Sequence, residues 1–538
     1  MISFDNAPIV YWFAGYILAE IVIAAGVFRL VPERVFICLS ILLLVFMRLP
    51  VIVFNRELNA DESQMLSHAI TLFRDPLYWR SVDGTTIGPL DNYLLVVPRI
   101  LGFQLNYISA RLIGILCSCG SLLLLFFTLK NWFGNVTART AFIFPLLFLS
   151  FTQEKDFVHY SSEQLPVFLL SLSMWLLSRI TNHSGSLKWN ALFLGLTAGT
   201  IPFAKLQAVP QAIVTVLAAF WVCYRWFELK RDSRPLKVLL LGGLTFPVIT
   251  FIWAYSFHVL TDLVDFYLFG NVIYASGNEA ISISALFLQI INLSADFRAF
   301  TIISLIPFIA AVIRIFQKSI DKKEDHVVRF VVLFMAFSSI YAVTKSGNNF
   351  IHYLNFCIIP WTLLVAYGLA NFRQWSIVPS VLLLMWFAAN SAYNYKKERT
   401  LNNYISSEKN AFEESAVVKA LKKYSKPDDC LVVWGWQSAY YVEAQLPQGT
   451  AESHSERSIF NHSMRQKYFS RYMKNMERTK PAIIIDAVGK NSLWLQDKKT
   501  QSLENFPEIN TYIQKNYSYA GSFDDTKLYI RKDRLQLR

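Results

Sequence analysis

The sequence predicts a polytopic α-helical membrane protein that ends in a small α/β domain. Of its 538 residues, 54% are hydrophobic and only 17% are charged, and the mean hydropathy is +0.35. A soluble chain carries about a quarter charged residues. Apolar runs recur as far as Tyr393, and the composition then becomes charged and only moderately apolar. These observations divide the chain into a transmembrane domain, residues 1–393, and a C-terminal domain, residues 394–538.

About twelve apolar runs are long enough to cross about 30 Å of hydrocarbon, so we expect about twelve transmembrane helices. The first run lacks a basic segment before it and a small-residue cleavage site, so we expect it to be retained rather than removed as a signal peptide. The runs fall near residues 9–30, 35–54, 107–128, 138–153, 164–180, 189–204, 208–226, 237–259, 299–317, 327–344, 351–371 and 375–393.

Basic residues gather in alternate connections between these runs, which assigns those connections to the cytoplasm. The opposite short connections carry only scattered single bases, such as Lys155, Lys205 and Lys345. The N-terminus, residues 55–106 and the C-terminal domain are then expected outside. The net charge of +13 therefore reflects orientation and an anionic membrane surface rather than nucleic-acid binding. The cytoplasmic set is Arg29, Arg34, Lys130, Arg139, Arg179, Lys188, Arg225, Lys230, Arg231, Arg234, Lys237, Arg314, Lys318, Lys322, Lys323, Arg329 and Arg373.

The C-terminal domain alternates strand-like and helical patterns, which is typical of an α/β domain. At about 140 residues it is large enough to bury its own core. The six cysteines lie almost entirely in apolar runs and show no CxxC spacing, so we expect no structural disulfide. The expected strands are 431–436, 482–486 and 527–531, and the expected helices are 437–445, 462–478 and 503–516.

The outer loop over residues 55–106 carries two adjacent acids, Asp61 and Glu62, where an apolar run meets water. Adjacent acids near a membrane surface are often simply solvated. A loop of about 50 residues rich in polar and turn residues is more often functional. A carboxylate beside low-dielectric surroundings can serve as a general base. Further polar residues in this loop include Arg56, Glu57, His68, Asp83, Asn92 and Tyr93.

Three further outer connections hold polar residues that suit a phosphate or a second acid. Lys205 lies in an apolar hairpin, where its charge either meets an anion or extends to the interface. Glu163, close to His159, is either a second acid or the cap of the following helix. His352 is either a ligand contact or a hydrogen-bonded core histidine, and Lys345 and Tyr353 beside it favour the ligand contact.

The order of these parts resembles the bacterial GT-C glycosyltransferases of the protein O-mannosyltransferase and lipid A aminoarabinose transferase kind. The resemblance covers nearly the whole chain through short motifs of moderate specificity. Two features depart from that pattern: the lysine hairpin lacks the Lys-Gly of many relatives, and phosphate-gripping arginines are not obvious. The matching segments are Asn59-Ala60-Asp61-Glu62, Asp83–Leu90, Ala110–Gly114, Gly195–Gly199 leading to Lys205, His352-Tyr353-Leu354 leading to Pro360, Val433–Trp436, Tyr440–Val442 and Ile485–Gly489.

The resemblance implies a glycosyltransferase that moves a sugar from a polyprenyl-phosphate donor to an envelope acceptor: lipopolysaccharide, another glycan or a protein. It places the catalytic base at Asp61, the first acid of the pair, with Glu62 in support. Lys205, Lys345, His352 and Tyr353 are expected to bind the donor phosphate. We expect His159, Glu163, Asn92 and Tyr93 to support the substrates.

We expect no cofactor. No second aspartate stands at DxD spacing around Asp61, which argues against a metal site without excluding a divalent ion. No GxGxxG motif follows a strand and no P-loop is present, so the sequence offers no nucleotide-binding fold.

Two other classes of function fit part of the pattern. About twelve helices with polar groups would also suit a transporter or flippase of envelope lipids or glycans. Such proteins usually carry internal repeats and polar breaks near mid-membrane, whereas here the polar groups cluster at one face. A non-catalytic partner in envelope assembly, with the C-terminal domain as its binding module, is the third class.

The charge asymmetry predicts the topology directly. Reporter fusions placed after Lys237 and after Lys323 should behave as cytoplasmic, and a fusion after Tyr395 as external. A C-terminal reporter found inside the cell would contradict the arrangement, because the acids and the C-terminal domain could not then share the outer face.

Overall fold

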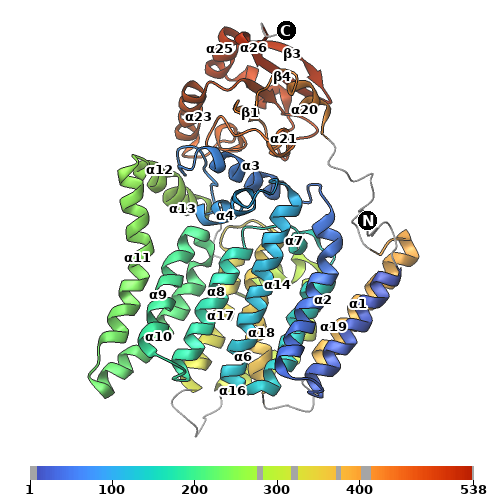
Figure 1. Cartoon of the computed structure of the whole chain (residues 1–538), viewed down its shortest axis with the longest axis vertical. Coiled ribbons are helices and arrows are strands. Elements are labelled where there is room, and N and C mark those ends of the chain that lie inside the picture. Colours follow the sequence, from blue (N-terminus) through green and yellow to red (C-terminus); the bar gives the residue numbers. More distant parts are fainter. Residues whose placement is uncertain (1–8, 276–282, 317–324, 371–376, 402–413, 536–538) are drawn as a thin grey trace. The chain divides into compact units, whose positions relative to one another are not determined.

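The computed structural model describes residues 9–275, 283–316, 325–370, 377–401 and 414–535 (Figure 1). The chain forms two compact units, each assembled from three stretches of sequence. The basic positions Lys318, Lys322, Lys323 and Arg373 lie outside the described residues. The helical unit comprises Met1–Phe54, Gly114–Ile252 and Ile273–Lys409, and the loop–sheet unit comprises Asn55–Ile113, Trp253–Val272 and Asn410–Arg538.

Helices build almost all of the helical unit, and each of the predicted apolar runs overlaps one or two of them (Figure 1). Their buried faces share one apolar core. The helices are α1 (Ile9–Val27), α2 (Glu33–Val53), α6 (Tyr107–Phe151), α7 (Lys155–Val158), α8 (Gln164–Thr181), α9 (Leu187–Ala204), η1 (Leu206–Ala208), α10 (Val209–Lys230), α11 (Arg234–Ser256), α14 (Ile283–Leu293), α15 (Ala295–Ile303), α16 (Leu305–Phe316), α17 (Asp325–Thr344), η3 (Ile351–Leu354), α18 (Asn355–Leu369) and α19 (Val378–Glu398).

The longest helix, α6, is broken at Gly134, which adopts φ 80° and ψ 166°. Glycine reaches such a conformation without a steric penalty. The rings of Phe126 and Phe142, on opposite sides of the break, lie 5.5 Å apart between centroids. A straight helix would separate them by about 24 Å. The chain therefore reverses at Gly134, which explains why the sequence shows two apolar runs, 107–128 and 138–153, within one helix.

Among the described helices, eight are long and apolar enough to cross a membrane, or nine if the pair α15 and α16, bent by 50°, is one span. The predicted membrane-embedded class is thus confirmed. The predicted number of about twelve spans is not reached by this criterion. The helices α9 and α19 are not among the eight, and α6 is counted once although it turns back at Gly134.

The loop–sheet unit joins the acidic outer loop to the C-terminal region in one compact body. Its elements are α3 (Ala60–Arg74), α4 (Pro89–Leu94), α5 (Val97–Ile100), α12 (Leu260–Asp262), η2 (Leu263–Phe269), α13 (Gly270–Ala275, which continues into the helical unit), α20 (Ala416–Leu421), β1 (Leu431–Trp434), α21 (Ala439–Ala444), α22 (Glu456–Ile459), α23 (Arg465–Thr479), β2 (Ile483–Asp486), α24 (Lys498–Gln501), η6 (Leu503–Asn505), α25 (Pro507–Asn516), β3 (Tyr517–Phe523), β4 (Thr526–Arg531) and α26 (Lys532–Leu535).

A mixed four-stranded sheet in the order β1-β2-β4-β3 forms the centre of the C-terminal region. β1 and β2 are parallel, and β4 runs antiparallel to both β2 and β3. Asp524 and Asp525 join β3 to β4 with φ values of 46° and 71°. Positive φ at both central residues is typical of a tight two-residue hairpin turn. The sheet confirms the three predicted strands and adds β3.

Both faces of β1 and β2 are buried, because alternate side chains of each strand enter different cores. Leu431, Val433 and Ile483 pack in the core that contains α20 and α21. Val432 and Ile484 pack in the core that contains α23 and α25. Burial on both sides explains why β1 and β2 are continuously apolar in sequence rather than alternating.

A buried charge cluster links the outer loop to the C-terminal region within this unit. Arg471 of α23 donates a hydrogen bond to Asp83 and lies 2.6 Å from Glu452 Oε1. Its guanidinium also stacks over the ring of Phe266, 3.4 Å from the centroid. Burial raises the pKa of Glu452, whereas the two carboxylates hold the pKa of Arg471 above its usual range despite its burial. One cation thus joins three distant stretches of sequence.

We predict that Arg471→Met destabilises the protein by about 3–5 kcal/mol, because two buried carboxylates would lose their shared cation. Thermal unfolding of the purified full chain, with proteolysis of the C-terminal region as a second readout, measures the loss. Lys467→Met is the matched control on the same helix, since Lys467 is exposed and the loss of its pair with the half-buried Asp265 should change stability by less than about 1 kcal/mol. Equal stability of the two variants would contradict the structural role of Arg471.

Candidate active site

The acidic pair lies in the first turn of α3, in the loop–sheet unit. Asn59 caps this helix, and its side-chain oxygen accepts a hydrogen bond from the backbone N–H of Asp61 at 3.0 Å. Acidic residues are favoured at this end of a helix, where backbone N–H groups point outward. The Asp61 side chain is half-buried rather than enclosed. The local sequence therefore fixes a partly accessible carboxylate at the start of a capped helix.

Glu62 is fully buried and is held by Arg111. Arg111 Nε donates to one carboxylate oxygen at 2.8 Å, and Nη2 donates to the other at 2.7 Å. Nη2 also donates to the carbonyl oxygen of Arg56 at 2.6 Å. A two-point Arg–carboxylate contact fixes orientation as well as distance. Glu62 therefore acts as an anchor for α3, and its partner lies in the first turns of α6.

A third acid, Glu57, lies beside the pair and is not among the site residues predicted from the sequence. It accepts a hydrogen bond from Ser63, whose Oγ also lies 2.8 Å from the Tyr107 hydroxyl. Burial, together with the nearby carboxylate of Glu62, raises the pKa of Glu57 to about 6. Glu57 lies six residues before Ser63, and this spacing matches no motif. The contact between the two side chains is therefore visible only in the folded structure.

Asn92 and Tyr93 brace the outer loop. The Asn92 amide donates to the Tyr78 hydroxyl at 2.8 Å, and its oxygen accepts from His68 Nδ1 at 3.1 Å. The Tyr93 hydroxyl donates to the carbonyl oxygen of Pro76 at 2.5 Å. Burial lowers the pKa of His68 to about 4, so this histidine is neutral near pH 7. These contacts hold the loop together within the loop–sheet unit.

A second cluster of buried polar groups lies in the helical unit, around Lys205. Lys205 ends α9 in an extended conformation and is only 3% exposed. Its ammonium pairs with Glu163 and donates to Ser162 Oγ at 2.6 Å. Burial raises the pKa of Glu163, but Lys205 and His352 outweigh it and hold the pKa at about 2. The two charges are predicted separately from the sequence, whereas the structure pairs them and buries Lys205 instead of extending it to an interface.

Tyr353, His352 and His159 surround this ion pair. The Lys205 ammonium lies 5.1 Å from the centroid of the Tyr353 ring. His352 Nδ1 is 3.6 Å from Asp156 Oδ1, and the rings of His352 and His159 are 6.2 Å apart. His159 Nδ1 donates to the Lys155 carbonyl oxygen at 2.8 Å, which leaves Nε2 as the acceptor nitrogen of the neutral ring.

Lys345 follows α17, and its side chain is half-buried. The segment after it returns to the cluster through a chain of hydroxyl contacts. The Asn348 amide donates to the Tyr274 hydroxyl at 2.6 Å, and that hydroxyl lies 3.1 Å from the Tyr353 hydroxyl. The structure thus brings His159, Glu163, Lys205, His352 and Tyr353 together in the helical unit.

The described residues contain no group of three or more His, Cys, Asp or Glu side chains arranged to hold a metal ion. No protein-family model matches the chain, and no curated protein sequence matches it.

Among solved structures, ArnT from Cupriavidus metallidurans bound to undecaprenyl phosphate matches with a TM-score of 0.56 at 10% identity, over 93% of this chain and 98% of that chain. The chain has the fold of ArnT. The predicted resemblance to the GT-C glycosyltransferases is thus confirmed at the level of the fold. The apo form of the same ArnT gives a TM-score of 0.42 at 10% identity, over 92% of this chain and 97% of that one. The oligosaccharyltransferase of Archaeoglobus fulgidus in its apo form gives a TM-score of 0.41 at 11% identity, over 97% of this chain and 74% of that chain.

We predict that Lys205 and Glu163 are energetically coupled. Lys205→Met and Glu163→Gln should each lose about 3–5 kcal/mol, because each leaves a buried charge without its partner. The double variant should lose clearly less than the sum of the two. Denaturation of the purified variants in mixed micelles measures the free energies of unfolding that make up this double-mutant cycle. Arg225→Met with Glu228→Gln is the matched control, because that pair is exposed and should be additive. Strict additivity at Lys205 and Glu163 would contradict the coupling.

Proposed function

We propose that this chain is a glycosyltransferase that moves a sugar from a polyprenyl-phosphate donor to an envelope acceptor at the outer face of a bacterial cytoplasmic membrane. The acceptor is lipopolysaccharide, another glycan or a protein. The observation that carries the proposal is the unequal pair: Glu62 is buried on Arg111, whereas Asp61 stays half-buried at a capped helix start. The ArnT fold supports a lipid-linked donor, since that relative was solved with undecaprenyl phosphate.

In the proposed reaction Asp61 is the general base. Its carboxylate takes the proton of an acceptor hydroxyl or amine while that oxygen or nitrogen bonds to the anomeric carbon. The bond from that carbon to the phosphate oxygen breaks, and polyprenyl phosphate leaves with the electron pair. Glu62 supports the base by fixing the first turn of α3 through Arg111. Positioned general bases contribute about 10²–10⁴ in rate.

We further propose that the carrier phosphate contacts Lys205, Lys345, His352 and Tyr353, with His159 and Glu163 in support. The buried ion pair is the argument for Lys205, because Glu163 holds the ammonium in place and an incoming phosphate would compete for the same donors. The acceptor nitrogen of His159 supports a role in holding a phosphate proton. Asn92 and Tyr93 would act indirectly, by keeping the outer loop in shape.

The segments that make up the loop–sheet unit support a C-terminal region outside the cell. Residues of the outer loop and of the C-terminal region belong to one compact unit, which supports the proposal that both lie on one side of the membrane. The charge pattern assigns the loop to the outside.

We predict that Asp61→Asn folds, still binds donor and loses about 10²–10⁴ in transfer rate, because the substitution removes the proton acceptor and keeps the size. Purified variants in lipid, assayed for release of polyprenyl phosphate and for acceptor modification, measure the loss.

Glu62→Gln is the companion variant and should lose less activity than Asp61→Asn. It should also lower stability, because it removes the charge that accepts two hydrogen bonds from the buried Arg111. Full activity in Asp61→Asn, with normal folding, would remove Asp61 from catalysis and leave both acids as structural residues.

A further inference from the structure

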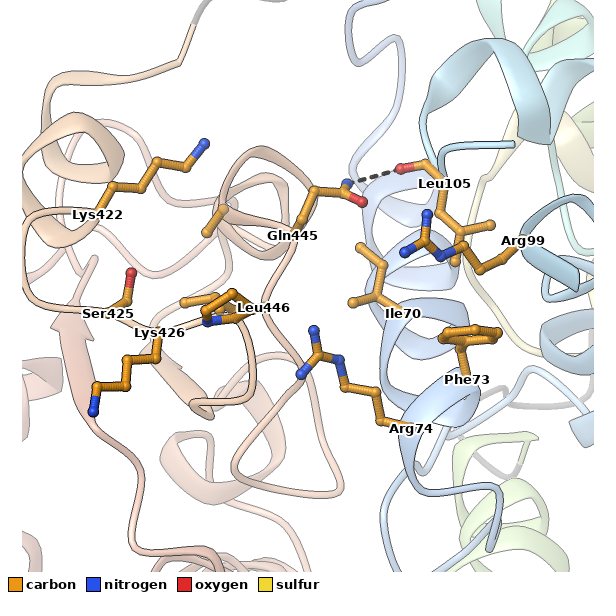
Figure 2. Close-up of a pocket in the computed structure, with 12 residues that line it drawn as sticks. Ile70, Phe73, Arg74, Arg99, Leu105, Lys422, Ser425, Lys426, Gln445 and Leu446 are labelled. Carbon is orange, nitrogen blue, oxygen red and sulfur yellow. Dashed lines mark hydrogen bonds between the residues drawn. The ribbon is translucent and has the colours of Figure 1, made fainter. Parts of the chain in front are cut away.

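A pocket of about 450 Å³ lies within the loop–sheet unit, and neither Asp61 nor Glu62 lines it (Figure 2). Ile70 and Phe73 of α3, with Leu105 and Leu446, supply an apolar lining. The Gln445 amide closes one wall by donating to the Leu105 carbonyl oxygen at 2.9 Å. This volume falls in the range of small-molecule sites.

Four cations line the pocket, and no acid does. Figure 2 shows Arg74 and Arg99 on one side, with Lys422, Ser425 and Lys426 on the other. Arg74 pairs with the exposed Asp428, and Lys422 pairs with Glu414. In the described part of the chain, neither Arg99 nor Lys426 forms an ion pair; Arg99 lies over the Phe73 ring at 5.3 Å. The pocket therefore offers excess positive charge to an anion.

The neighbouring segment indicates which kind of anion. Ile100, Leu101 and Phe103 follow Arg99 and are 70%, 68% and 64% exposed. Leu105, a lining residue, stands just before Tyr107, the first residue of the membrane-spanning helix α6. Exposed apolar side chains beside a cation at the end of a membrane helix are typical of the lipid head-group region.

We propose that this pocket binds the phosphate-bearing head group of an anionic membrane lipid, with Ile100, Leu101 and Phe103 in the adjoining interface. Arg99 and Arg74 suit phosphate oxygens, because a guanidinium can donate two parallel hydrogen bonds. Lys422 and Lys426 add charge from the opposite wall, and the Ser425 hydroxyl adds a donor. Basic pockets beside membrane helices recognise such head groups through charge and hydrogen bonding together. The site does not depend on the proposed transfer reaction.

The test is native mass spectrometry of the purified full chain titrated with dioleoyl phosphatidylglycerol, dioleoyl phosphatidylcholine or glycerol 3-phosphate. The wild type should bind phosphatidylglycerol about tenfold more tightly than phosphatidylcholine, which corresponds to about 1.4 kcal/mol. The double variant Arg99→Gln/Lys426→Gln should bind phosphatidylglycerol about tenfold more weakly than the wild type. Both residues are exposed, so thermal unfolding should be unchanged.

Lys419→Gln with Lys423→Gln is the matched control, since it removes two exposed charges of the same region that do not line the pocket. Phosphatidylglycerol binding should be nearly unchanged in it. Equal losses in both pairs would overturn the proposal in favour of general surface charge, and equal binding of the two lipids would also overturn it. Glycerol 3-phosphate binding as tightly as the lipid would overturn a membrane lipid as the ligand.

Discussion

The two-point ion pair between Glu62 and Arg111 is the contact on which the acidic loop depends. It ties the first turn of α3 to the first turns of α6, and both side chains are almost fully buried. Burying two charges costs several kcal/mol per ion, and only close geometry with further hydrogen bonds repays that cost. Arg111 meets this condition through the carbonyl oxygen of Arg56. Glu62 is therefore committed to holding α3, and the proposed catalytic role falls to Asp61, which is half-buried.

The requirement that a buried charge be paired also applies to two other buried cations. Lys205 is paired with Glu163, and Arg471 is shared between Asp83 and Glu452. In each case the partner of the buried cation is a buried acid. Substitution of one partner therefore changes stability as well as any chemistry, and activity losses at these positions are informative only beside a stability measurement.

Apolar run length predicted the helices well, because a membrane-spanning helix must satisfy its backbone internally and present apolar side chains. The strands β1 and β2 were equally visible, since burial on both faces makes them continuously apolar. β3 was missed, because its residues are mostly half-exposed and its pairing with β4 shifts register between Tyr519 and Gly521. The sequence also did not predict the ion pair between Glu163 and Lys205 or the one between Asp83 and Arg471. No local pattern encodes contacts between residues so far apart in sequence.

Mass spectrometry of envelope lipids and glycans from a strain lacking this gene, beside the complemented parent, tests the central claim most directly. The account predicts that one saccharide mass disappears from one envelope component and that its polyprenyl-phosphate-linked form accumulates. Both changes should reverse on complementation. Identical envelope glycans and lipid-linked sugars in the two strains would contradict a role in sugar transfer.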